Sequence, residues 1–160
     1  MNQNGHEPSV MIVDDEEMVI TSIKAFLQLE TEYEVHGFTD PECAARFAGH
    51  HQIDVAVSDY LMPKMNGIQL LGRLKELQPE ASRVLLTGHA DKQSAIQAIN
   101  QVALFQYLEK PWDNAQLLLV IQSGAERARL FRDLREKVDE LDAAHSSLKE
   151  VQKRLLQAFL

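Results

Sequence analysis

Short apolar runs alternate with amphipathic stretches along most of the chain, and this alternation restricts the fold more than any other feature. Helical patterns separate successive runs, and strands that alternate with helices are typical of repeated β-α units. Such units build a parallel sheet covered by helices, so the sequence predicts an α/β fold with five parallel strands. The runs expected to form these strands are Val10–Val13, Tyr33–Phe38, Ile53–Ser58, Arg83–Leu86 and Leu104–Leu108.

Four helices are expected between the strands, and local signals mark where they begin. Pro41 follows Asp40 at one start, where a missing backbone N–H removes no helical hydrogen bond. Asp91 is expected to cap another helix with its carboxylate. The predicted helices run over Glu17–Glu30, from Asp40-Pro41 to Ala48, over Ile68–Leu77 after the turn-rich segment Met62–Gly67, and from Asp91 to Asn100.

Polar side chains stand where four of the apolar runs end. They are Asp14 and Asp15, Asp59, Thr87 and Lys110. The carboxyl ends of parallel strands share one edge of a sheet, so these three carboxylates, one hydroxyl and one ammonium should converge there. Clustered carboxylates repel one another, which raises their pKa values unless a cation is bound. The set suits Mg²⁺, which prefers a few carboxylates, water and phosphate oxygens.

A helical pattern without proline runs from Asp113 to Leu160, and its second half has leucine at every seventh position. With leucine at d and the alternate seam positions at a, the heptads predict a parallel two-stranded coiled coil. Lys137 at g would face Asp142 at e of the partner helix. The seam comprises Phe131, Leu134, Val138, Leu141, His145, Leu148, Gln152, Leu155 and Phe159.

Two other interpretations of the leucine pattern remain open. The helix could pack on a domain absent from this chain, or the repeat could reflect a helix-rich composition alone. In the coiled-coil interpretation, His145 and Gln152 lower stability but could set the register, as buried polar a residues can.

Charge and composition disfavour several classes of function. Residues 1–122 carry a net charge of −9 and residues 123–160 a net charge of +1, so neither part has the basic excess of a nucleic-acid-binding surface. Cys43 is the only cysteine, which rules out an internal disulfide. No stretch approaches the roughly 18 apolar residues of a membrane span, and residues 1–9 lack a signal-peptide core. A cytoplasmic protein without membrane or direct nucleic-acid contact is therefore expected.

Four motifs together resemble those of the bacterial response-regulator receiver (CheY-like) domain. The resemblance covers roughly residues 8–125 and implies a flavodoxin-like doubly wound sheet with strand order 2-1-3-4-5. Residues 126–160 then form a coiled-coil dimerisation or linker segment, which we expect to lead to an effector absent from this chain. The motifs read Val-Asp14-Asp15-Glu, Val-Ser-Asp59-Tyr-Leu-Met-Pro63-Lys-Met-Asn-Gly67, Leu-Leu-Thr87-Gly-His and Leu-Glu-Lys110-Pro111-Trp.

The resemblance implies a role for each residue of the acidic cluster. Asp59 corresponds to the phosphoacceptor. Asp15 corresponds to the direct ligand of Mg²⁺ (or Mn²⁺), and Asp14 acts on the ion largely through water. The backbone carbonyl of Leu61 corresponds to the remaining protein ligand.

The resemblance also implies how a signal would leave the site. Thr87 and Lys110 match the pair that contacts the phosphoryl group, and Tyr107 matches the aromatic ring that turns inward as Thr87 moves. This change would reshape the face formed by the fourth helix, fifth strand and fifth helix. Pro111 matches a proline that often follows a cis peptide bond.

The expected function is phosphorelay signalling. A sensor histidine kinase or phosphotransfer protein would donate a phosphoryl group to Asp59, and no effector enzyme is expected within this chain. One alternative is a haloacid-dehalogenase-like phosphohydrolase, although Asp59 is followed by Tyr60-Leu61 and lacks the second acid of that family's Asp-x-Asp motif. Another is a dimerisation adaptor that works without phosphorylation.

Overall fold

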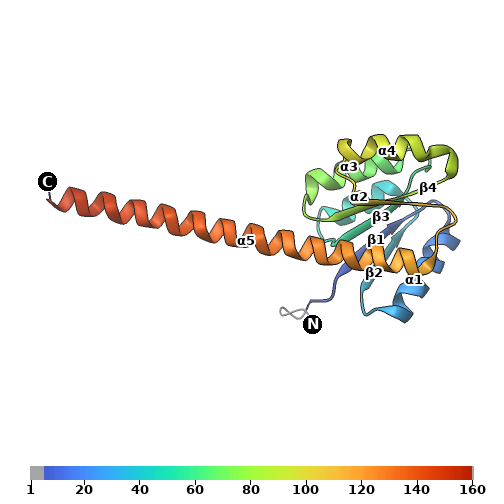
Figure 1. Ribbon diagram of the computed structural model, residues 1–160, viewed down its shortest axis with the longest axis horizontal. Helices are drawn as coiled ribbons and strands as arrows, with labels where there is room; N and C mark the ends of the chain where they lie inside the picture. Colours follow the sequence, from blue (N-terminus) through green and yellow to red (C-terminus); the bar gives the residue numbers. More distant parts are fainter. Residues whose placement is uncertain (1–5, 160) are drawn as a thin grey trace. The chain divides into compact units, whose positions relative to one another are not determined.

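A five-stranded, wholly parallel sheet with the order β2-β1-β3-β4-β5 organises the protein (Figure 1). The computed structural model describes residues 6–159. The predicted α/β class and strand order are confirmed. The strands are β1 (Ser9–Val13), β2 (Glu34–Phe38), β3 (Val55–Asp59), β4 (Ser82–Thr87) and β5 (Gln106–Glu109).

Helices cover both faces of the sheet, so every residue of β1, β3 and β4 is buried. Successive residues of β1 point to opposite faces: Val10 and Ile12 pack with α1 (Glu17–Glu30) and with the first part of α5 (Asn114–Phe159). Met11 and Val13 pack on the other face, which is covered by α2 (Pro41–Ala48), α3 (Gly67–Leu77) and α4 (Lys92–Gln101) (Figure 1).

Side-chain caps begin two of these helices. The Asp40 carboxylate accepts a 2.9 Å hydrogen bond from the Glu42 amide at the start of α2. At the start of α3, Asn66 and Gln69 form a reciprocal capping box with bonds of 2.8 and 2.9 Å.

The predicted Asp91 cap is wrong. No side-chain bond from Asp91 caps α4, because the chain enters this helix through the 3₁₀ turn η1 (His89–Asp91). In this turn the Asp91 amide donates to the Gly88 carbonyl at 3.1 Å.

The fifth strand begins two residues later than predicted. The Leu104 amide donates to the Ile99 carbonyl of α4, and the Leu104 side chain packs with α3 and α4. Leu104 therefore belongs to the turn that follows α4, and pairing with β4 starts when the Phe105 amide donates to the Arg83 carbonyl at 2.8 Å.

The last helix, α5 (Asn114–Phe159), is continuous, as its proline-free sequence predicts. Contacts divide the chain into two units, Met1–Ala128 and Arg129–Leu160. In the first unit α5 is anchored by buried residues such as Leu117 and Ile121. Described residues of the second unit are exposed along almost their whole length, including its large apolar side chains.

Gly67 allows the start of α3 to lie directly against the end of β3. Its amide donates to the Tyr60 carbonyl at 2.9 Å, and a Cβ at this position would overlap the Asp59 carbonyl oxygen. The Leu85 side chain would lie 2.8 Å from the same Cβ. Only glycine permits this approach, which holds the backbone of Asp59 in place.

We expect Gly67→Ala to lower the free energy of unfolding by about 1–3 kcal/mol, because the new methyl group must displace backbone. Urea denaturation at neutral pH measures this. Gly72→Ala, in the same helix, is the control: its Cβ would meet only Val102 Cγ1, at 3.6 Å. Alanine should leave stability unchanged or raise it by up to about 1 kcal/mol there, and equal losses in the two variants would contradict the argument.

Candidate metal and phosphoryl site

The predicted site residues meet at the carboxyl edge of the sheet. Asp14 and Asp15 follow β1, Asp59 ends β3, Thr87 ends β4, and Lys110 follows β5. The strand order reverses between β1 and its neighbour β3, which is where open α/β sheets bind ligands. The topology therefore brings together all five residues that the sequence singled out.

Three carboxylates form the centre of the site. Oxygen atoms of Asp14, Asp15 and Asp59 all lie within 4.8 Å of one another. Lys110 Nζ lies 3.0 Å from Asp59 Oδ1 and 3.7 Å from Asp14 Oδ2. Asp14 is fully buried and Asp59 is 6% exposed, whereas Asp15 is exposed to solvent. One ammonium group is thus shared by two buried carboxylates.

Burial is the main cause of the shifted pKa values in this cluster. It raises the pKa of Asp14 to about 6, against the effect of the Glu16 amide, which donates to Asp14 Oδ1 at 2.8 Å. The negative charge of Asp59 adds a smaller increase. Burial also raises the pKa of Asp59, although its hydrogen bond with Lys110 opposes this. The expected rise is present, but desolvation contributes more than repulsion between carboxylates.

Burial has the opposite effect on the pKa of Lys110, but the neighbouring carboxylates outweigh it. Burial acts to lower the pKa of its ammonium group, but the hydrogen bond to Asp59 and the carboxylate charges outweigh burial and raise it. Lys110 therefore stays protonated at neutral pH and can donate to an anionic oxygen.

Two buried oxygen atoms in the described residues have no hydrogen-bond partner, and both belong to this site. They are Asp14 Oδ2 and Thr87 Oγ1. An unpaired buried polar atom is rare and calls for a missing partner. A hard cation suits the carboxylate oxygen, and a phosphoryl oxygen suits the hydroxyl. The residues present therefore fit both Mg²⁺ and a phosphoryl group.

Tyr107 and Thr87 lie on the same face of the sheet. The register pairs Leu85 with Tyr107 and Thr87 with Glu109. Residues two apart on a strand point the same way, so Tyr107 lies in the next pair along that faces the same side of the sheet as Thr87. The Tyr107 ring is half-buried and packs with the cluster beneath α3 and α4.

Glu109 is a neighbour of the site that the sequence reasoning missed. His89 Nδ1 lies 2.6 Å from Glu109 Oε1, which links the turn after β4 to the end of β5. The only available signal was the position of Glu109 directly before Lys110. The next peptide bond, Lys110–Pro111, is cis.

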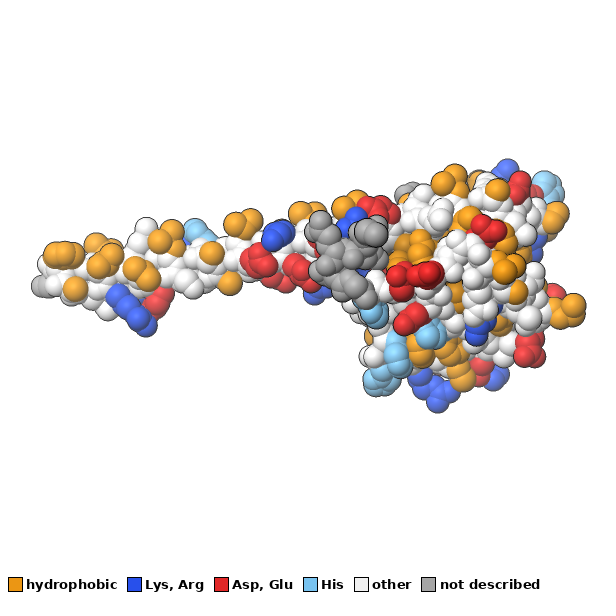
Figure 2. All heavy atoms as spheres, turned by 90° about the horizontal axis from the view of Figure 1, so that it is seen from below, with side chains coloured by type: hydrophobic (Ala, Val, Ile, Leu, Met, Phe, Trp, Pro, Cys, Tyr) orange, Lys and Arg blue, Asp and Glu red, His pale blue; other side chains and the backbone are white. Residues whose placement is uncertain are grey.

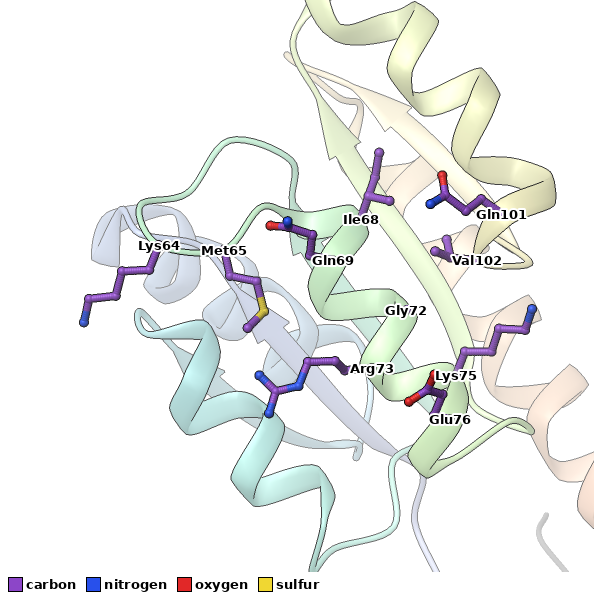
Figure 3. A pocket seen from close by; sticks show the side chains of 10 residues that line it. All are labelled: Lys64, Met65, Ile68, Gln69, Gly72, Arg73, Lys75, Glu76, Gln101 and Val102. Atoms are coloured by element: carbon purple, nitrogen blue, oxygen red, sulfur yellow. The ribbon is translucent and has the colours of Figure 1, made fainter.

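A hollow of about 680 Å³ lies elsewhere, over α3 and the end of α4 (Figure 3). Residues such as Gln69, Gly72 and Val102 line it, and none of the acidic cluster does. Arg73 points away from α4 toward α2 (Figure 3), where its guanidinium pairs with Glu42 at 3.1 Å. This hollow is separate from the carboxylate site.

Comparison with known proteins identifies the class of the chain. Residues 10–122 match the response regulator receiver domain family, and the chain belongs to this family. A receiver domain is the phosphoacceptor signalling domain of two-component systems. The phosphohydrolase and phosphorylation-independent alternatives are not favoured.

Individual relatives agree with this assignment. The chain is 29% identical over 150 residues to the transcriptional regulatory protein FixJ of Rhizobium meliloti, covering 94% of this chain and 72% of FixJ. It is 23% identical over 143 residues to the hydrogenase transcriptional regulatory protein HoxA of Bradyrhizobium diazoefficiens, covering 89% of this chain but only 29% of HoxA. A response regulator receiver domain protein from Clostridium thermocellum superposes with a TM-score of 0.72 at 30% identity, over 78% of this chain and 98% of the other.

A search of the helices in the described part of the chain reveals none that is both long enough and apolar enough to cross a membrane.

We expect Asp14→Asn to stabilise the metal-free protein at pH 7.5 by up to about 3 kcal/mol, because a tenfold difference in proton affinity corresponds to about 1.4 kcal/mol. The pKa of Asp14 is about 6 when folded and 3.8 ordinarily, so the folded state binds more protons between these values. The contribution of Asp14 to stability therefore falls as pH rises from about 4 to 6.

Urea denaturation with a chelator at pH 7.5 and 4.5 measures this difference. The gain from Asp14→Asn should be large at pH 7.5 and small at pH 4.5. Asp15→Asn is the control, since it removes a neighbouring but exposed carboxylate. An equal gain from Asp14→Asn at both pH values would show that the burial of charge is not the cause.

Proposed function

We propose that Asp59 is the phosphoacceptor of this receiver domain, which spans residues 8–125, and that a sensor histidine kinase or phosphotransfer protein is the donor. The observation that carries the proposal is that two buried atoms, Asp14 Oδ2 and Thr87 Oγ1, have no hydrogen-bond partner in the same site as Asp59. They leave one place for a cation and one for a phosphoryl oxygen within the same cluster.

Asp14, Asp15, Asp59 and the Leu61 carbonyl would hold Mg²⁺ or Mn²⁺. When bound, the ion supplies positive charge that neutralises phosphoryl oxygens. Phosphoryl transfer depends mostly on positioning and electrostatic stabilisation, which this site offers. Asp59, fixed by the packing of Gly67 against its carbonyl, has its carboxylate directed at Lys110.

In the transfer, a carboxylate oxygen of Asp59 forms a bond to phosphorus as the phosphorus–nitrogen bond of the donor phosphohistidine breaks. The imidazole nitrogen keeps the electron pair of that bond. Lys110 would donate to a phosphoryl oxygen that takes over part of its present contact with Asp59. The product is an acyl phosphate, which is open to hydrolysis.

The phosphoryl group would then be sensed by Thr87 and Tyr107. The Thr87 hydroxyl gains a phosphoryl oxygen as its missing acceptor and moves toward it. The movement would make room for Tyr107, two register positions away on the same face, to turn inward. The face formed by α4, β5 and α5 changes as a result.

We expect Asp59→Asn to abolish labelling of the protein by acetyl phosphate with Mg²⁺, because an amide oxygen is not a competent nucleophile here. The label is measured on phosphate-affinity gels and checked by its lability to hydroxylamine. Asp54→Asn is the matched control: Asp54 is also 6% exposed, but it precedes β3 and accepts a bond from the Ser9 amide. Undiminished labelling of Asp59→Asn would refute the assignment.

We propose that residues 126–160 form a parallel coiled-coil dimer with a second copy of the chain. The seam residues Leu134, Val138, Leu141, Leu148 and Leu155 are 46% to 69% exposed. Hydrophobic side chains follow one another along this part of α5 in Figure 2. Two identical stripes of this kind bury each other in a coiled coil.

Phosphorylation would bias this dimer because one helix, α5, serves both the switch face and the seam. If the first turns of α5 contact the second copy differently after phosphorylation, the alignment of the two heptad seams changes as well. The domain would act in the cytoplasm and would not itself contact nucleic acid. Transcriptional control is the named role of FixJ and HoxA, and the chain spans only 29% of HoxA.

We expect Leu148→Glu to convert the dimer to a monomer, because it places two carboxylates in an apolar layer. Analytical ultracentrifugation measures the mass. Ser147→Glu, which adds the same charge one position away at heptad position c, should leave the dimer intact. The affinity of the unsubstituted dimer should change when a beryllofluoride phosphoryl mimic is added. A monomeric mass both with and without the mimic would argue against the coiled coil.

A further inference from the structure

We propose that His145 makes the coiled-coil dimer sensitive to pH. Two His145 side chains, one from each copy, meet in the central layer of the seam, and protonation of both weakens the dimer. This inference rests on the dimer proposed above and adds a form of regulation that is independent of Asp59.

His145 occupies the middle of the seam. The a positions from Phe131 to Phe159 are spaced by seven residues, and His145 is the third of the five. The other a and d positions in this segment hold aromatic or aliphatic side chains, apart from Gln152. His145 is therefore the only seam residue that titrates, and its side chain is exposed in the single chain.

The residues at the e and g positions, which flank the seam, favour a parallel dimer in register. In such a dimer a g residue meets the e residue five positions later on the other helix. Lys137 then meets Asp142, which is an attractive pair. Val151 meets Leu156, and these exposed apolar side chains cover each other. Lys137 contacts Glu140 of its own helix at 3.4 Å in the single chain, but both groups are exposed and this pair contributes little.

The two remaining flank pairs contain no like charges. Leu130 meets Arg135, and Ala144 meets Lys149, so an apolar side chain lies beside the stem of a basic one in each. In an antiparallel dimer g would face g and e would face e, and neither matched pair would form. The parallel register sets every residue opposite its own copy, which places His145 opposite His145.

The surroundings of this layer oppose a double positive charge. Leu141 and Leu148 lie directly before and after His145 in the seam, and Ala144 of the second copy flanks it. Lys149, four residues later at e in each helix, adds positive charge at the edge. Asp142, three residues earlier at e, is the only carboxylate facing the layer, and Lys137 of the second copy pairs with it.

Neutral and charged imidazoles behave differently in this layer. A neutral or singly protonated pair can form a hydrogen bond, because one ring donates an N–H and the other accepts. When both rings are protonated neither accepts, and two charges are confined among leucines. The dimer therefore binds fewer protons than two separate chains, and its affinity must fall as pH falls and the imidazoles become protonated.

The test is sedimentation equilibrium of the full unphosphorylated chain at pH 7.5 and 5.5, without metal or phosphoryl donor. We expect the dimer dissociation constant to rise at pH 5.5 by about fivefold if the dimer keeps one proton, and by about a hundredfold if it keeps none. His145→Gln should dimerise with the same constant at both pH values, since glutamine already occupies the a position at 152.

His51→Gln is the matched control. His51 is an exposed histidine whose ring stacks on Phe47 at the end of α2, so this variant should keep the full pH dependence. A pH-independent dissociation constant for the unsubstituted dimer, or a pH dependence that survives in His145→Gln, would overturn the inference alone. A monomer at pH 7.5 would overturn the proposed dimer itself. None of these three results would bear on the proposed phosphorylation of Asp59.

Discussion

The burial of two carboxylates beside one ammonium group is the interaction on which the function of this domain depends. Asp14 and Asp59 are removed from water, and Lys110 lies 3.0 Å from one and 3.7 Å from the other. One cation cannot neutralise both carboxylates and the exposed Asp15 as well. The site therefore holds excess negative charge at neutral pH, and a divalent cation relieves it. Repulsion among the carboxylates therefore favours the binding of a cation at this cluster.

The sheet around the cluster is rigid enough to sustain this unfavourable arrangement. β1, β3 and β4 are buried on both faces, and these strands place Asp14, Asp59 and Thr87 at one edge. Gly67 lets α3 press against the backbone of Asp59. A packed core does not deform continuously, so strain at the edge is transmitted to neighbouring elements. Tyr107, half-buried on the same face of the sheet as Thr87, is the neighbour that we propose to move.

The second half of α5 differs from the sheet because packing within the chain does not bury its apolar side chains. Its large apolar side chains are exposed, and a single helix of this kind gains little stability alone. Burying the stripe against an identical stripe removes this surface from water. In the proposed dimer, the polar members of the seam, His145 and Gln152, would reduce stability and restrict the register. The dimer that we propose would therefore respond to small changes in charge or geometry.

Sequence patterns alone were enough to predict the α/β class, the continuous last helix and the identity of the five edge residues. Periodicity and strand-end polarity are local properties, and four ordered motifs made the family recognisable. Local reasoning failed at Asp91 and Leu104, where a 3₁₀ turn and packing against α3 and α4 set the boundaries. Which polar atoms are removed from water could be seen only once the chain was folded. Burial, more than charge repulsion, shifts the pKa of Asp14, and Thr87 Oγ1 is left without a partner, because both depend on residues far apart in the chain packing together.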